Sequence, residues 1–162
     1  MRNAMMGVGL AGAFVAGLFA SKVMPDARAQ SAPPPAAPPA QTFTPRIINL
    51  TTELKDEDIG PLVPMTELRT RTLGGTEFGT IGVQSGNIFK HFHADAHEVQ
   101  YIIEGRGTFW LGDKQVDIKP GDLIFIPKGT VHAGSKTSDG GRFRAIAFKM
   151  PPQRPDDTKR VD

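Results

Sequence analysis

The chain has 162 residues, enough for one domain, and it contains no cysteine, which excludes disulfides, zinc ribbons, thiol nucleophiles and iron–sulfur clusters. Its net charge of +2 arises in residues 1–29, where Arg2, Lys22 and Arg28 stand against Asp26 alone; in the rest of the chain basic and acidic side chains are equal in number. The basic isoelectric point is therefore no evidence for a nucleic-acid partner, and the sequence contains no nucleotide-binding loop or basic DNA-reading helix.

Residues 1–29 have the pattern of an export signal. Arg2 supplies the positive start, Asn3 to Ser21 carry no charge, and Ala27-Arg28-Ala29 fits the small-residue cleavage pattern, with the cut before Gln30. The alternative is an uncleaved membrane anchor, because the apolar run is nearly long enough to span a bilayer. Its many glycines and alanines favour cleavage. We therefore expect a periplasmic or secreted protein that contacts a membrane only if this N-terminal segment remains uncleaved.

Two further segments have compositions that cannot build a core. Residues 30–45 form a Pro/Ala-rich linker, in which Ser31 to Ala40 read SAPPPAAPPA, and they are expected to be an extended, polyproline-like spacer. Residues 151–162 are rich in proline and charge and are predicted to form a disordered tail.

Between these segments, residues 46–150 alternate short apolar runs with turn residues, a rhythm typical of an all-β sandwich or barrel. Gly112-Asp113 is a two-residue hairpin signal, and Thr52 to Asp58 is the only weak helix candidate. The expected strands are Leu68–Leu73, Phe78–Val83, Asn87–Phe92, Val99–Glu104, Thr108–Leu111, Gln115–Ile118, Leu123–Ile126 and Arg142–Lys149.

The four histidines are concentrated around one segment of this domain. His91, His93 and His97 lie close together, Glu98 follows at once, and His132 comes just beyond a Pro-Lys-Gly turn. Imidazole and carboxylate ligands suit Fe, Mn, Ni, Cu and Zn alike. If one coordination position stays open to water or substrate, such a site is catalytic rather than structural.

Strand alternation specifies how these side chains can meet. His91 and His93 share one face of a strand, whereas Glu98 stands an odd number of positions after His93. The segment Ala94-Asp95-Ala96 must therefore bend the chain if Glu98 is to rejoin the histidines. His97 would replace Glu98 as a ligand if the bend were one residue shorter; we favour instead that it faces solvent or orients a ligand.

The spacing of these residues resembles the cupin superfamily. The first cupin motif is glycine, a short spacer, His-x-His, three or four residues, glutamate, six residues and glycine, matched here by Gly86, His91, His93, Glu98 and Gly105. The second is glycine, five residues, Pro-x-Gly, two residues and histidine, matched by Gly121, Pro127, Gly129 and His132. The resemblance covers residues 86–136. It implies a double-stranded β-helix (jelly-roll) barrel in which His91, His93, Glu98 and His132 bind one divalent transition metal.

The resemblance also implies a range of functions. We expect an exported metal-dependent enzyme acting on a small oxygenated organic molecule, with dioxygenase chemistry first because it is common among cupins. Glu98 is expected to act as a catalytic base as well as a ligand. The alternatives are a redox-neutral isomerase or lyase, and a non-catalytic extracytoplasmic module that binds a metal or a small ligand. Exposed sheet edges allow a homodimer.

Several other side chains can be read either as structural or as functional. Gln100, on the same face as Glu98, either touches substrate or lines the barrel as a satisfied polar group. Arg142 and Arg144 share one face of the last predicted strand and are expected to be exposed charges rather than groups that steer an anionic substrate. The aromatic residues expected in the core are Phe109, Trp110, Phe125 and Phe143.

Overall fold

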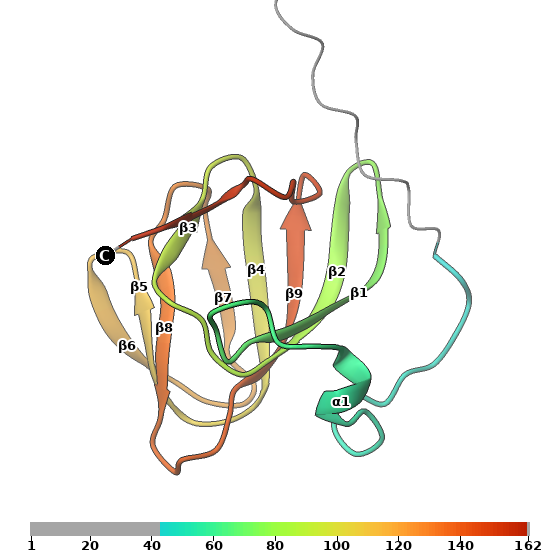
Figure 1. The fold of residues 1–162 in the computed structure, drawn as a ribbon, viewed down its shortest axis with the longest axis horizontal. Helices are drawn as coiled ribbons and strands as arrows, with labels where there is room; N and C mark the ends of the chain where they lie inside the picture. The colour runs from blue at the N-terminus through green and yellow to red at the C-terminus, as the bar shows by residue number, and fades with distance from the viewer. Residues whose placement is uncertain (1–42, 162) are drawn as a thin grey trace, which may run out of the picture. The chain divides into compact units, whose positions relative to one another are not determined.

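The computed structural model describes residues 43–161, in which ten strands form two antiparallel five-stranded sheets (Figure 1). One sheet has the order β1-β2-β9-β4-β7 and the other β10-β3-β8-β5-β6. The strands are β1 (Arg69–Thr76), β2 (Gly79–Ser85), β3 (His91–His93), β4 (His97–Glu104), β5 (Gly107–Leu111), β6 (Lys114–Ile118), β7 (Leu123–Ile126), β8 (His132–Thr137), β9 (Arg144–Met150) and β10 (Thr158–Arg160). The predicted all-β class is confirmed.

The predicted export signal and residues 30–42 of the predicted linker lie outside the described residues. Among residues 43–161 the only helix is the single turn α1 (Asp56–Ile59), in place of the candidate over Thr52 to Asp58. Asp58 Oδ2 accepts a hydrogen bond from the Lys55 backbone at the start of this turn (3.2 Å). No helix in the described part of the chain combines the length and the apolar character needed to cross a bilayer.

The core lies between the sheets, because alternate side chains of each strand point inward. Along β4 the inward residues Glu98, Gln100 and Ile102 are buried, and along β7 Ile124 and Ile126 are buried while their neighbours are exposed. The apolar core cluster is Ile102, Phe109, Ile118, Ile124, Ile126, Ala133, Phe143 and Ala145. Each large side chain in it stabilises the fold by about 1.5–3 kcal/mol. Several residues of this cluster also line the cavity described below, and they give it one apolar wall.

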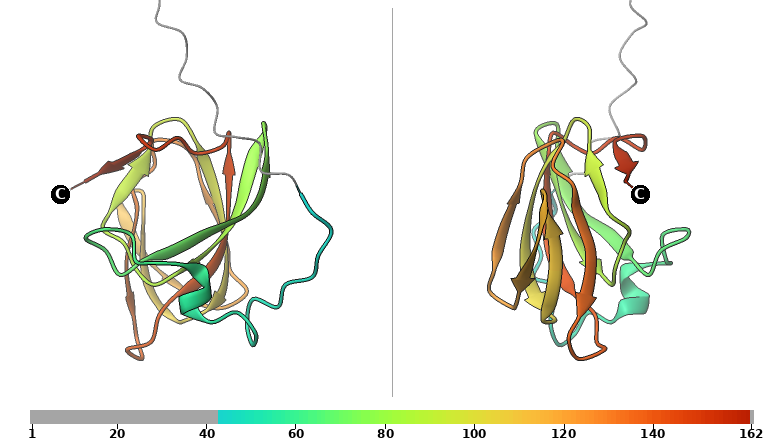
Figure 2. Two further views of the ribbon diagram at one scale, coloured as in Figure 1. Left: turned by 45° about the vertical axis from the view of Figure 1, so that its right-hand side comes forward. Right: turned by 90° about the vertical axis from the view of Figure 1, so that its left-hand side faces the viewer.

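The predicted bend after His93 is confirmed, because the chain there passes from one sheet to the other (Figure 2). Residues 94–96 belong to neither β3 nor β4. The backbone N–H of Ala94 donates to Asp157 O (3.0 Å), and that of Asp95 donates to Asp157 Oδ1 (2.6 Å). These two bonds hold the bend, which turns Glu98 back toward the histidine strand.

Most predicted strands overlap observed strands to within about three residues at each end, but three predictions need correction. Residues 87–90 were predicted as part of a strand but are irregular. The Asn87 side chain bonds to the backbone of Ser135 (Ser135 N–H to Oδ1, 2.9 Å), in place of the backbone-to-backbone bonds of a regular sheet. Strand β8 was not predicted, since its sequence HAGSKT has almost no apolar alternation. The tail was predicted to be disordered, yet β10 pairs with β3.

Two side-chain predictions are also wrong. Phe125 is 67% exposed, because it lies on the outer face of its sheet; Phe109 and Phe143 are buried as predicted. Arg144 is 2% exposed rather than an exposed strand charge. The chain before β1 covers it: Arg144 donates to the carbonyls of Leu50 and Leu54 (2.9 Å each) and pairs with Asp56 (2.7 Å).

Candidate metal centre

Strands β3 and β8 bring three histidines together on the inner face of their sheet. His91 and His93 come from β3, and His132, which begins β8, pairs directly with His91 in the sheet register. The three side chains are at most 5% exposed, and one ring nitrogen of each lies within 4.8 Å of the others. Two segments that are distant in the sequence therefore converge as the motifs predicted, and the three-histidine group could hold a metal ion.

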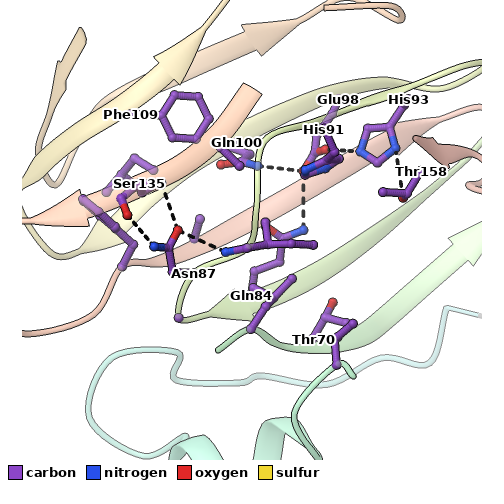
Figure 3. A pocket seen from close by; sticks show the side chains of 18 of the residues that line it. Thr70, Gln84, Asn87, His91, His93, Glu98, Gln100, Phe109, Ser135 and Thr158 are labelled. Carbon is purple, nitrogen blue, oxygen red and sulfur yellow. Dashed lines mark hydrogen bonds and ion pairs between the residues drawn. The ribbon is translucent and has the colours of Figure 1, made fainter. Parts of the chain in front are cut away.

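Glu98 reaches the same point from the opposite sheet (Figure 3). Its Oε2 lies 2.8 Å from His93 Nε2 and 3.4 Å from His132 Nε2. Its Oε1 accepts hydrogen bonds from Gln100 Nε2 (2.8 Å) and Gln84 Nε2 (3.4 Å). The two amides fix the carboxylate so that its other oxygen faces the histidines. Gln100 thus points inward, and its amide supports Glu98.

Backbone carbonyls determine the tautomers of two of the histidines. His91 Nδ1 lies 3.0 Å from Phe89 O, and His132 Nδ1 lies 2.9 Å from Thr130 O. A carbonyl can only accept, so each Nδ1 carries the proton and each Nε2 presents a lone pair.

The Nε2 of His132 is buried without a hydrogen-bond partner, although a carboxylate oxygen lies 3.4 Å away. Two acceptors that face each other in a buried site favour a proton or a metal ion between them, because an unpaired buried acceptor is costly. The donor set therefore fits a first-row divalent metal, which imidazole and carboxylate ligands suit.

Electrostatics place these groups in the protonation states that a metal needs. Burial, reinforced by the electrostatic repulsion between the protonated forms of His91 and His132, lowers the pKa of His91 to about 4. Burial raises the pKa of Glu98, but His132, His93 and the charge of Lys149 outweigh burial and hold the pKa of this carboxyl well below its usual range. At neutral pH, His91 is therefore a neutral imidazole and Glu98 a carboxylate, as metal binding requires.

The lowered pKa of His91 predicts an acid sensitivity of the metal-free protein. The ordinary value is 6.5 and the folded value about 4, so between these pH values the unfolded chain binds a proton that the folded chain does not. The stabilising effect is present above pH 6.5 and is lost as the pH falls toward 4. We expect His91 to account for about 2–3 kcal/mol of lost unfolding free energy between pH 7 and about pH 4.5.

Urea unfolding of the metal-free protein at both pH values measures this loss. The pH dependence should be smaller in His91→Asn than in wild type. The exposed His97 provides the matched control, and His97→Asn should behave as wild type. Equal pH dependence in His91→Asn and wild type would contradict the assignment.

His97 lies outside the cluster, consistent with the solvent-facing position favoured from the sequence. It is exposed, and its Nδ1 has only a long contact with the Lys128 backbone N–H (3.4 Å).

The site contains two charged residues that sequence reasoning did not identify. Lys149, from β9, places Nζ 3.2 Å from His93 Nε2 and 3.6 Å from Glu98 Oε2. Asp157 is 1% exposed, and its Oδ2 lies 3.4 Å from His93 Nδ1. Strand alternation could have placed Lys149 inward with Ala145 and Ala147. Asp157 carried no comparable signal, because it lies in a segment of disorder-like composition.

A cavity of about 190 Å³ lies beside these residues. Its wall on the histidine side includes His91, His93, Glu98 and Lys149. The remaining wall combines apolar side chains with neutral polar ones, among them Ile88, Ile102, Phe109, Phe143, Asn87 and Gln84. Figure 3 shows Gln84, Gln100 and Asn87 around this space. Its size suits a small organic molecule, since drug-sized ligands occupy pockets of roughly 300 Å³ or more.

Comparison with known proteins identifies the family. Residues 80–148 match the family model described as "Cupin domain". The chain belongs to the cupin superfamily. The predicted double-stranded β-helix barrel agrees with this assignment, as do the solved structures of similar fold.

The curated relatives of this cupin include both uncharacterized proteins and dioxygenases. It is 34% identical over 71 residues to an uncharacterized protein of Methanocaldococcus jannaschii, covering 43% of this chain and 54% of that protein. It is 33% identical over 52 residues to quercetin 2,3-dioxygenase of Bacillus subtilis, a match that covers 32% of this chain and 15% of that enzyme. It is 34% identical over 70 residues to acireductone dioxygenase of Candida albicans, a match that covers 40% of this chain and 39% of that enzyme. The matches thus span about half or less of these relatives.

Solved structures support the fold alone, because their identities to this cupin are low. A variant of Streptomyces Pac13 with uridine superposes with a TM-score of 0.51 at 19% identity, over 59% of this chain and 78% of that one. A conserved Klebsiella pneumoniae protein with a double-stranded beta-helix domain superposes with a TM-score of 0.50 at 17% identity, over 62% and 90%.

Proposed function

We propose that this cupin is a metal-dependent enzyme acting on a small oxygenated organic molecule, with dioxygenase-type chemistry as the leading assignment. The observation that carries the proposal is the convergence of three buried histidines and one carboxylate beside a small cavity, with the Nε2 of His132 left without a partner. The similarity to proteins named as dioxygenases supports the choice of chemistry. The proposed ligands are His91, His93, Glu98 and His132, and the metal is Fe, Mn, Ni, Cu or Zn.

When bound, the metal would polarise the oxygens of a substrate and, if it is redox-active, supply electrons to oxygen chemistry. The residues of the chain orient and enclose the site. The carbonyls of Phe89 and Thr130 keep two imidazoles in the metal-binding tautomer, and the amides of Gln84 and Gln100 hold Glu98. Glu98 is proposed as a residue that would hold the metal and as the group that would accept a proton from the substrate. Its low pKa favours the ligand role over the role of base.

Lys149 supports a second candidate, a redox-neutral isomerase or lyase. Its Nζ lies beside Glu98 Oε2 (3.6 Å) at the cavity wall, where an ammonium would stabilise a developing enolate or carboxylate oxygen. Chemistry of this kind needs a positioned acid, a base and an electrostatic partner for the oxygen, but no oxygen consumption.

Metal analysis combined with an oxygen electrode tests both candidates. We expect the reconstituted full chain to bind about one equivalent of divalent metal and to consume oxygen with a phenol or diketone substrate. Turnover of substrate without oxygen uptake would favour the redox-neutral enzyme, and metal binding without any turnover would favour a non-catalytic binding module. Failure to bind metal after reconstitution would overturn the proposal.

Export is a further part of the proposal and rests on residues 1–29 alone. The mass of the protein recovered from the cells that produce it tests the idea. A mature chain that begins at Gln30 outside the cytoplasm is expected. An intact N-terminus in the membrane fraction would indicate an anchor instead, and an intact N-terminus in the cytoplasm would contradict export.

We also infer that a second copy of the chain covers the outer face of β4, β7 and β9. This face exposes Tyr101, Leu123, Phe125, Phe148 and Met150. Its charged positions lie at one end, where the buried Arg144 of β9 pairs with Glu104 of β4 (3.8 Å). The five side chains expose about 500 Å² together, taking about 200 Å² for each when free. Half-buried apolar neighbours extend the patch toward the roughly 800 Å² per partner of a stable interface.

Light scattering of the full chain and of a chain lacking residues 1–42 should give dimers of both, and Phe125→Asp should give monomers. A monomeric full chain would rule out the dimer. A dimer that disappears with residues 1–42 would assign the contact to that segment instead.

A further inference from the structure

The C-terminal segment, residues 151–161, runs along the strand that carries two of the proposed ligands. Strand β10 pairs with β3 so that Thr158 lies opposite His93 and Arg160 opposite His91. Two backbone bonds extend the contact on either side: Ala94 N–H donates to Asp157 O (3.0 Å) and Val161 N–H donates to Lys90 O (2.9 Å). Figure 1 shows this segment, in red, beside β3. The segment thus closes the edge of the sheet at the candidate metal centre.

Asp157 is the most buried polar residue of this segment. Its Oδ1 accepts a hydrogen bond from the Asp95 backbone (2.6 Å). Its Oδ2 is buried and has no hydrogen-bond partner, yet it lies 3.4 Å from His93 Nδ1. A buried carboxylate oxygen left unpaired is costly, and the only proton that a ring nitrogen could offer it here is one on His93 Nδ1. A shift of about half an ångström would bring this pair to the length of a charge-assisted hydrogen bond.

The three histidines differ in what faces Nδ1. His91 and His132 each have a backbone carbonyl there, from Phe89 and Thr130. For His93 the polar atoms that face Nδ1 are Asp157 Oδ2 and Thr158 Oγ1 (3.5 Å). A carboxylate can only accept, so Asp157 favours the Nδ1–H tautomer, in which Nε2 keeps the lone pair that a metal needs. At Nε2, Lys149 Nζ (3.2 Å) can only donate and favours the same tautomer, whereas Glu98 Oε2 (2.8 Å) favours the opposite one. The Thr158 hydroxyl can also donate, which would select the opposite tautomer.

We propose that Asp157 is a positioning residue that holds His93 in the Nδ1–H tautomer and so directs its Nε2 toward the metal. This inference rests on the metal site proposed above. Acidic partners of this kind orient a ligating imidazole and make it a stronger donor, and their loss typically weakens metal binding by about 10–100-fold. Without Asp157, the Nε2–H tautomer would donate to Glu98 Oε2, which already lies 2.8 Å away, and that proton would block the ligand position.

Asp157→Asn tests the proposal with almost no change of shape. The asparagine carbonyl can keep the bond from Asp95, and its amide group then donates toward His93 Nδ1. The matched control is Asp156→Asn, because the neighbouring Asp156 side chain is 71% exposed. Thr158→Val removes the other polar group at this nitrogen. Urea unfolding of each metal-free variant shows whether the fold is retained.

Two measurements on the full chain decide the outcome. Competition with a chromogenic chelator gives the Zn²⁺ dissociation constant, which we expect to rise about 10–100-fold in Asp157→Asn and to change little in Asp156→Asn or Thr158→Val. Long-range ¹⁵N–¹H spectra of the metal-free protein report the tautomer, and we expect Nδ1–H of His93 in wild type and Nε2–H in Asp157→Asn.

The outcomes separate this inference from the proposed function. Tight Zn²⁺ binding by wild type with an unchanged dissociation constant and tautomer in Asp157→Asn would overturn the role of Asp157 and leave the metal site intact. A wild type that binds no Zn²⁺ would overturn the metal site and this inference with it. A larger effect of Thr158→Val than of Asp157→Asn would assign the positioning role to the hydroxyl instead.

Discussion

The double variant His91→Ala, His93→Ala is expected to bind no metal under conditions in which wild type binds about one equivalent. Both side chains lie in β3 with their rings 5.1 Å apart, so the variant removes half of the four proposed ligands from a site that the other half cannot complete. The loss should be close to complete, because His132 and Glu98 alone offer one imidazole and one carboxylate. Metal analysis after reconstitution and gel filtration measures the result.

The exposed residue His97 supplies the control for this variant. His97→Ala removes an imidazole from the same stretch of sequence but not from the cluster, and it should bind metal as wild type does. Because removal of two buried side chains could also unfold the barrel, circular dichroism of the metal-free proteins must show β structure in both variants. A folded double variant that still binds stoichiometric metal would contradict the assignment of these ligands.

Asp56→Ala is expected to cost about 3 kcal/mol of unfolding free energy, since it leaves the buried charge of Arg144 with the longer contact to the half-exposed Glu104 carboxylate (3.8 Å). Arg144 is 2% exposed and donates to Asp56 Oδ1 (2.7 Å), while Arg142 Nε lies 2.8 Å from Asp56 Oδ2. The Ser85 hydroxyl donates to the same carboxylate (2.8 Å). Burial raises the pKa of Asp56, but these hydrogen bonds and the charges of both arginines outweigh burial and lower it. The network fastens the chain before β1 to the barrel.

Urea unfolding near neutral pH measures this cost, and two comparisons interpret it. Lys119→Ala breaks a solvent-exposed ion pair with Asp122 and should leave stability close to wild type. The double variant Asp56→Ala, Arg144→Met removes both charges of the pair and should recover much of the loss, because an apolar side chain needs no counter-charge. If Asp56→Ala were as stable as wild type, the carbonyls of Leu50 and Leu54 would be sufficient partners for Arg144.

The sequence predicted the parts of the site that depend on local spacing. Alternation along a strand places His91 and His93 on one face, and the odd interval to Glu98 requires the bend that the structure contains. The motif around Pro127 and Gly129 carried the signal for His132, although β8 itself lacks an apolar pattern. These features arise from short stretches of chain, so they are visible without knowledge of the fold.

The residues that sequence reasoning missed owe their positions to contacts between distant segments. Asp157 is buried because β10 pairs with β3, and the Pro-rich sequence around it does not predict that pairing. Arg144 is buried because the chain before β1 crosses that end of the barrel. Phe125 is exposed because it lies on the outer face of its sheet. Alternation shows which residues share a face but not which face meets the second sheet. Local pattern cannot supply such information.

The central claim is that His91, His93, Glu98 and His132 surround one cation. X-ray absorption spectroscopy of the protein loaded with one equivalent of Zn²⁺ tests it most directly. The claim predicts three imidazole nitrogens and one carboxylate oxygen at about 2.0–2.2 Å, with imidazole scattering lost in the double variant His91→Ala, His93→Ala. A bound Zn²⁺ with only oxygen ligands, or a spectrum that the double variant leaves unchanged, would contradict it.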